Sequence, residues 1–138
     1  MKLHPAIEQV LPALPLVSGG ITSSWTGQDG GQDVSVFTTR EMIDYSNSRG
    51  SQYREGLWVL WHGKPPVQIY SDLGYVDWDY GPPESARRCY LSNLRVEKGV
   101  VHVRHDSTPV GDRSVAGRVE DLQYTLHELL KSQQSPVI

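Results

Sequence analysis

The feature that most constrains the fold is a run of large apolar residues, Leu57-Trp58-Val59-Leu60-Trp61. Because successive side chains of a β-strand point to opposite faces of the sheet, a strand that is apolar at every position must be covered on both faces. Gly63-Lys64-Pro65-Pro66 then provides a turn, and Val67 to Ser71 is expected to return as the antiparallel partner. The chain therefore needs a sheet with packed layers on both sides.

A second hairpin is predicted from Arg88 to Asp106, with its turn at Lys98-Gly99. Cys89 and Leu91 have the opposite parity to the residues expected to face the core. Either both faces are therefore partly covered, or a β-bulge lies near Ser92-Asn93. The residues expected to face the core are Tyr90, Leu94, Val96, Val101 and Val103.

Three segments have helical patterns. Leu3 to Leu14 places apolar residues on one helical face, and the proline at position 12 is expected to end or kink this helix. Thr38-Thr39-Arg40-Glu41 has the spacing of a capping box and predicts a short helix to about Ser48. Val115 to Leu130 repeats apolar residues along one helical face and gives the clearest helical pattern. Val34 to Phe37, before the second helix, is expected to form a short strand.

These elements predict a single α+β domain over residues 1–138, in the order α-β-α-β-β-β-β-α. About five mostly antiparallel strands are expected to pack against an N-terminal and a C-terminal helix. Three segments are expected to lie outside this core: a glycine-rich mobile loop at 18–33, an acidic and aromatic loop at 72–84, and a tail at 134–138. The glycine-rich segment lacks the spacing of a phosphate-binding or dinucleotide-binding loop.

Composition limits the classes of function. The net charge of −3 provides no global basic field for a polyanion, which argues against a nucleic-acid partner. A single cysteine, Cys89, excludes an internal disulfide and a zinc site built from cysteines, and it fits a reducing compartment. No apolar stretch approaches the roughly 20 residues of a membrane span, and the N-terminus lacks the pattern of a signal peptide, so a cytoplasmic protein without membrane contact is expected. A local basic patch would have to come from Arg87, Arg88, Arg95 and Arg104.

Two histidines are the candidates for acid–base chemistry. His62 directly follows the apolar strand beside a glycine, and His105 has the parity of the apolar positions of its strand. His102 has the opposite parity, so His102 and His105 are expected on opposite faces and do not predict a shared metal ion. Cys89 lies within a predicted strand and is interpreted as a buried structural residue. No metal site and no cofactor are predicted, and the sequence favours a non-enzymatic role.

The segment from 72 to 84 combines carboxylates with large aromatic residues. Tyrosine and tryptophan are favoured anchors at protein interfaces, and carboxylates steer basic partners. The residues expected to bind a partner are Tyr75, Asp77, Trp78, Asp79 and Tyr80. The leading hypothesis is therefore a small protein-binding module of the inhibitor, immunity or accessory type. One alternative is a small-molecule-binding or simple hydrolytic pocket that uses His62 and His105, and another is a structural subunit of an oligomer.

The residues Tyr90 to Glu97, followed by Gly99 and by Val100 to Arg104, resemble paired sheet strands of the NTF2-like (SnoaL-like) cone family. That family places its main helices before the long strands, whereas the clearest predicted helix here follows them. The resemblance is therefore not used to assign a family.

Overall fold

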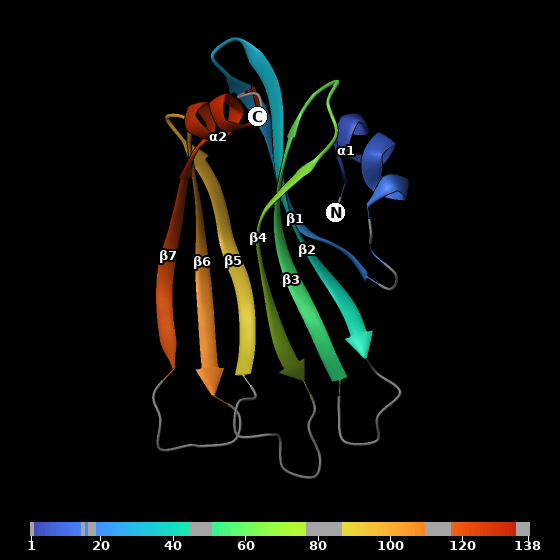
Figure 1. The fold of residues 1–138 in the computed structure, drawn as a ribbon, viewed down its shortest axis with the longest axis vertical. Coiled ribbons are helices and arrows are strands. Elements are labelled where there is room, and N and C mark those ends of the chain that lie inside the picture. Colours follow the sequence, from blue (N-terminus) through green and yellow to red (C-terminus); the bar gives the residue numbers. More distant parts are fainter. Residues whose placement is uncertain are drawn as a thin grey trace.

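The computed structural model describes residues 2–14, 16, 19–44, 51–76, 87–109 and 117–134. These residues form two antiparallel sheets, sheet A in the order β1-β2-β3-β4 and sheet B in the order β5-β6-β7 (Figure 1). The strands are β1 (Gly19–Asp29), β2 (Gln32–Asp44), β3 (Ser51–Trp61), β4 (Val67–Val76), β5 (Arg87–Glu97), β6 (Val100–Pro109) and β7 (Arg118–Thr125). The helices are α1 (Pro5–Val10), with a 3₁₀ turn at Leu11–Ala13, and α2 (Leu126–Gln134).

Sheet A is the central layer, as the apolar run in β3 requires. The odd-numbered residues of this run, Leu57, Val59 and Trp61, pack against Val101 and Val103 of sheet B and against other apolar side chains. The even-numbered residues, Trp58 and Leu60, pack on the other face of sheet A with side chains of the N-terminal helical segment, including Ile7 and Leu14. The predicted two-sided burial of this strand is confirmed.

The predicted α+β class with about five strands is wrong. The described residues form seven strands, and their two α-helices span six and nine residues. The helix predicted from Thr38 is instead the second half of β2, in which Thr38, Thr39 and Arg40 pair with Leu57, Gly56 and Glu55 of β3. Pairing along a fully buried neighbour outweighs the local capping-box spacing here. Residues 45–50 lie outside the described residues.

The glycine-rich segment at 18–33 is not a mobile loop within its described residues. It contains β1, a turn at Gly30-Gly31 and the start of β2, and β1 pairs with β2 from Asp29↔Gln32 back to Gly19↔Glu41. Both turn glycines have positive φ, +57° and +80°, a backbone conformation that glycine adopts without steric cost. Such a two-residue turn joins adjacent antiparallel strands directly.

The predicted C-terminal helix is correct only in its last part. Arg118–Thr125 forms β7, in which Leu122 and Tyr124 pair with Val103 and Val101 of β6. The helix begins at Leu126, which is fully buried in the core between the sheets. Leu122 and Leu126 fit a strand period of two as well as a helical spacing of four, so these two positions do not distinguish the two structures. Of the predicted tail, residues 135–138 lie outside the described residues.

The two predicted hairpins are confirmed. The hairpin of β5 and β6 turns at Lys98-Gly99, and its register shifts between Ser92 and Arg95, where the bulge was expected. β4 returns beside β3, as predicted. The predicted loop at 72–84 is wrong for residues 72–76, which are the last part of β4 and pair with β3, and residues 77–84 lie outside the described residues. Among the described residues, no helix is both long enough and apolar enough to cross a membrane.

Candidate functional site

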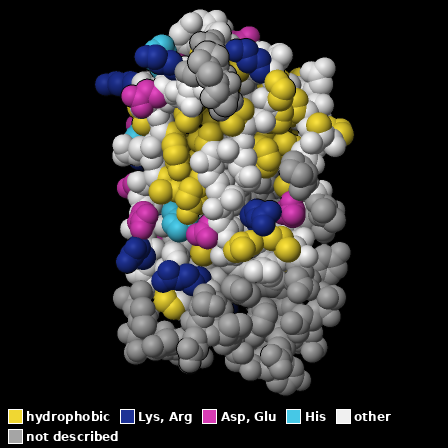
Figure 2. Space-filling model, in the orientation of Figure 1, with side chains coloured by type: hydrophobic (Ala, Val, Ile, Leu, Met, Phe, Trp, Pro, Cys, Tyr) yellow, Lys and Arg dark blue, Asp and Glu magenta, His cyan; other side chains and the backbone are white. Residues whose placement is uncertain are grey.

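The space between the two sheets has an apolar half and a polar half. Along β3 the inward-facing residues change from Leu57, Val59 and Trp61 to Glu55, and along β6 they change from Val101 to His105. Figure 2 shows hydrophobic side chains gathered over the upper part of one face of the molecule, with histidine and acidic side chains at their lower border. Burying polar groups costs free energy of folding unless the groups form hydrogen bonds. The hydrogen bonds of this polar half therefore show how its side chains are arranged.

At the centre of this polar half, His105 of β6 and Asp72 of β4 form a hydrogen-bonded pair across the two sheets. His105 Nε2 lies 2.9 Å from Asp72 Oδ2. The side chain of His105 is 10% exposed and that of Asp72 is 35% exposed, so the carboxylate forms the solvent-facing side of the pair. The histidine is therefore held from one sheet by a carboxylate of the other.

Tyr70 of β4 contacts both members of this pair. Its hydroxyl donates to Asp72 Oδ2 at 3.4 Å and lies 3.3 Å from His105 Nε2, and its ring meets the imidazole edge-on. Burial and the neighbouring Asp72 carboxylate raise the pKa of the Tyr70 phenol, so Tyr70 remains a hydrogen-bond donor at neutral pH.

Cys89 of β5, the single cysteine of the chain, completes the cluster from the third strand. It is 1% exposed. Burial, followed by the charge of Asp72 and a hydrogen bond to it, raises the pKa of the Cys89 thiol to about 11. The thiol therefore carries its proton at neutral pH and donates it toward Asp72, while a hydrogen bond from Ser107 opposes the shift. A protonated, buried thiol is not an activated nucleophile.

Asp72, Cys89 and His105 together present an oxygen, a sulfur and a nitrogen atom, all within 4.8 Å of one another. They are the one such group of metal-ligating side chains found in the described part of the chain. Ligand atoms around tetrahedral zinc lie roughly 3.3–3.6 Å apart, as follows from metal–ligand distances of about 2.0–2.3 Å. The donor atoms would reach that geometry by side-chain adjustments of roughly 1 Å or less.

A second buried cluster holds β5 in place beside this group. Glu55 of β3 is 1% exposed and accepts two hydrogen bonds of 3.0 Å from Arg40. Its Oε1 also accepts the backbone N–H of Leu91, at 3.1 Å, and the hydroxyl of Tyr53 accepts the backbone N–H of Cys89, at 3.2 Å. Side chains of sheet A thus satisfy backbone donors of β5, an edge strand of sheet B, and fix the position of Cys89.

The two histidines that the sequence singled out lie in different places. His105 is in the cluster described above, whereas His62 follows β3 at the side of sheet A that faces α1. His62 Nε2 lies 2.8 Å from the buried Ser35 Oγ, and its ring lies 5.1 Å from that of His4. The structure therefore does not bring His62 and His105 into one site.

The predicted acidic and aromatic binding surface is only partly within the described residues. Asp77, Trp78, Asp79 and Tyr80 lie outside them, and Tyr75 is described only as a backbone position of β4. A protein partner for this surface, basic or otherwise, stays a prediction.

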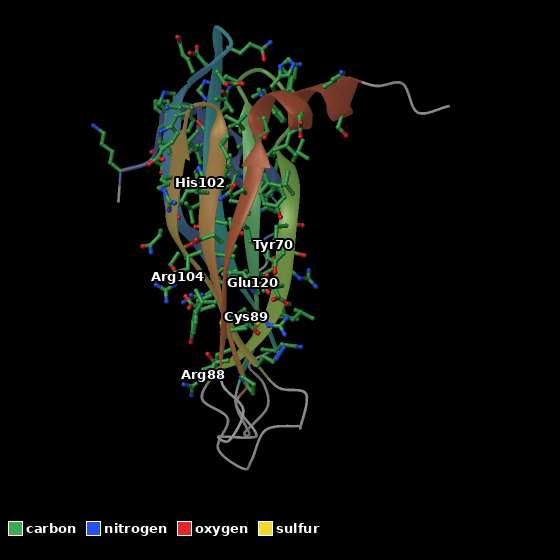
Figure 3. The ribbon with its side chains drawn as sticks, turned by 90° about the vertical axis from the view of Figure 1, so that its left-hand side faces the viewer. Tyr70, Arg88, Cys89, His102, Arg104 and Glu120 are labelled. Atoms are coloured by element: carbon green, nitrogen blue, oxygen red, sulfur yellow. The ribbon has the colours of Figure 1, made fainter. Side chains whose placement is uncertain are left out.

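Two of the arginines considered as a basic patch lie on one side of sheet B. Figure 3 shows Arg88 and Arg104 on the same side of the sheet as His102, away from Tyr70. Arg104 and Arg95 each form an ion pair with a carboxylate two residues further along the strand, Asp106 at 3.2 Å and Glu97 at 3.6 Å. These pairs partly offset the positive charge of Arg95 and Arg104.

The sequence does not predict the combination of Asp72, Cys89 and His105. The three residues are far apart along the chain and form no motif. The single cysteine excludes a zinc site built from several cysteines, but it does not exclude a site in which Cys89 is one of several different ligands. One signal was present: His105 shares the parity of the buried Val101 and Val103, so a polar, metal-ligating side chain had to face the interior. The expected opposite placement of His102 is confirmed (Figure 3).

Comparison with models of protein families, with curated proteins and with solved structures finds no match for this chain. The assignment of a function therefore depends on the geometry of the site.

Proposed function

We propose that this protein binds one divalent transition-metal ion of the Zn²⁺ type between its two sheets, through Asp72, Cys89 and His105. The observation that carries the proposal is the convergence of three different ligand atoms, from β4, β5 and β6, within 4.8 Å. Three protein ligands leave a fourth tetrahedral position for water or another small ligand, as in catalytic zinc sites.

The chemistry of the donors favours zinc over calcium or magnesium. Ca²⁺ and Mg²⁺ prefer oxygen ligands, whereas thiolate and imidazole are typical ligands of Zn²⁺ and of neighbouring transition metals. One thiolate and one carboxylate also balance the charge of a divalent ion, so the bound cluster would be neutral in its half-buried surroundings. Asp72, the most exposed of the three side chains, would form the entrance for the ion.

Tyr70 and Glu55 would support this site without binding the ion. The Tyr70 hydroxyl donates to the Asp72 carboxylate and orients it. Glu55 holds the backbone of β5 through Leu91. Hydrogen-bond partners of metal ligands typically contribute about 10–100-fold in metal affinity.

Cobalt titration is the experiment that tests this proposal. Co²⁺ substitutes for Zn²⁺ and gives a thiolate-to-metal charge-transfer band, and Cys89 is the single thiol that could produce it. We expect one Co²⁺ per chain, the charge-transfer band in the near ultraviolet, and displacement by one equivalent of Zn²⁺. A chain that is folded by circular dichroism and yet gives no such band contradicts the proposal.

Variants identify the ligands. Cys89→Ser should abolish the band, and Asp72→Asn or His105→Gln should weaken Co²⁺ binding beyond the roughly 10–100-fold effect expected of Tyr70→Phe. The matched controls are His62→Gln and Asp106→Asn, which alter a histidine and a carboxylate outside the donor group. Equal affinity in the controls and the ligand variants would contradict this ligand set even if some metal binds.

A further inference from the structure

A groove lies on the opposite face of sheet A from the metal-ligand cluster. It has a volume of about 560 Å³ and runs between the N-terminal helical segment and the turn that joins β3 to β4. Figure 1 shows α1 beside this turn. Pockets for small molecules typically measure about 300–1,000 Å³, so the groove has the size of a ligand site.

The walls of the groove are mostly apolar. Ala6, Val10 and Ala13 line it from the helical segment, and Leu60 lines it from β3. Pro65 and Pro66 form the side of the turn, where their rings restrict the backbone. Such a surface suits a ligand with an apolar body.

Among the described residues that line this groove, Lys64 is the one that carries a charge. It is exposed, and its ammonium group forms no ion pair with any described residue. His62 lies beside it, and the imidazole is held in place by the buried hydroxyl of Ser35, 2.8 Å from Nε2. An uncompensated cation next to an apolar wall is complementary to a negatively charged head group on an apolar body.

We infer that this groove binds a small anionic amphiphile, a carboxylate with a medium-length alkyl chain, with its head group at Lys64 and its chain along α1. The shape and the apolar lining of the groove fit the apolar body of the ligand, and Lys64, the unpaired cation among the described lining residues, fits a negatively charged head group. This site is separate from the proposed metal site and does not depend on it.

Octanoate is the probe. We expect octanoate to displace the fluorescent anion 1-anilinonaphthalene-8-sulfonate from the protein, and to do so more effectively than octanol or octylamine, which have the same chain with a neutral or a cationic head group. Displacement by octanol equal to that by octanoate, or a failure of octanoate to bind, would overturn the inference.

Lys64→Gln should weaken octanoate binding by roughly tenfold or more, because a charge-assisted contact would be lost. Lys64→Glu should weaken it further, and octylamine should then bind better than octanoate. Lys98→Gln is the matched control, since Lys98 is also an exposed lysine next to a glycine in a hairpin turn.

Ala13→Glu gives an independent test at the other wall of the groove, where a carboxylate should repel octanoate. Unchanged octanoate affinity in both Lys64 variants, with the fold retained, would place the ligand elsewhere.

Discussion

At the scale of single residues, the hydrogen bonds of Asp72, Cys89 and His105 depend on which of their atoms carry protons. Asp72 is the acceptor for donors from Tyr70, His105 and Cys89. The raised pKa of Cys89, about 11, means that the ion-free protein stores a proton on sulfur that a metal ion must displace. Metal binding at this site is therefore coupled to proton release.

This coupling predicts how metal affinity depends on pH. Below a thiol pKa of about 11, the thiolate fraction rises tenfold for each pH unit, so Zn²⁺ affinity should rise about tenfold per unit above neutrality. Isothermal titration in buffers of different ionisation enthalpy should show about one proton released from Cys89 per ion bound. An affinity that is flat with pH, or equal in Cys89→Ser, would show that the thiolate is not a ligand.

The sequence predicts some properties of these residues but does not predict that their side chains lie close together. The inward orientation of His105 follows from its parity with Val101 and Val103, and the burial of Cys89 is the usual state of a structural cysteine within a strand; both are found in the structure. Asp72 was assigned to a loop, and its placement beside His105 depends on how sheet B packs on sheet A. The packing of one sheet against another is a tertiary property that no local sequence pattern encodes.

At the scale of elements, β5 is held to sheet A by buried polar side chains in addition to apolar packing. The Glu55 carboxylate lies between the Arg40 guanidinium and the backbone N–H of Leu91. The guanidinium carbon of Arg40 lies 5.4 Å and 5.1 Å from the ring centroids of Tyr53 and Tyr90. The hydrogen bonds to Glu55 raise the pKa of Arg40, so the guanidinium is charged at all ordinary pH values.

Removing the buried carboxylate of Glu55 should destabilise the fold. Glu55→Ala should lower the free energy of unfolding by about 1–3 kcal/mol, because it leaves the buried Leu91 N–H without its acceptor, whereas the Arg40 side chain is 40% exposed and regains water. Urea denaturation measures this loss. Glu97→Gln, at a carboxylate whose side chain is 65% exposed and paired with Arg95, should change stability by less than about 1 kcal/mol. Equal effects in the two variants would contradict the role assigned to Glu55.

The elements themselves were predicted unevenly, for physical reasons. The β3–β4 and β5–β6 hairpins were predicted because their apolar pattern and turn residues agree. β1 was missed because it is rich in glycine and polar residues, although Gly30-Gly31 is a typical turn between paired strands. The sequence predicts a helix where β7 lies, because Leu122 and Leu126 fit both the helical and the strand period. In both β1 and β7, pairing with a neighbouring strand determines the secondary structure that forms.

At the scale of the whole molecule, the apolar half of the interior supplies the stability and the polar half supplies the proposed site. Leu126, at the start of α2, is fully buried in the apolar half with side chains of both sheets. Because α2 itself is short, its first residue carries much of its attachment to the core.

Leu126→Ala should therefore lower the free energy of unfolding by about 2–5 kcal/mol through the lost contacts and the cavity left behind. Leu73→Ala is the matched control, since Leu73 on β4 is 41% exposed and should cost about 1 kcal/mol or less. Thermal and urea denaturation compare the two variants. An unchanged melting temperature for Leu126→Ala would contradict the placement of α2 against the core.

The proposed ion would join the two sheets, because Asp72 belongs to sheet A while Cys89 and His105 belong to sheet B. X-ray absorption spectroscopy of the zinc-loaded protein tests this ligand set most directly. We predict one sulfur neighbour at about 2.3 Å and nitrogen or oxygen neighbours at about 2.0–2.2 Å, with the sulfur lost in Cys89→Ser. A zinc shell made only of nitrogen and oxygen atoms, or a shell unchanged in Cys89→Ser, would contradict the metal site between the sheets.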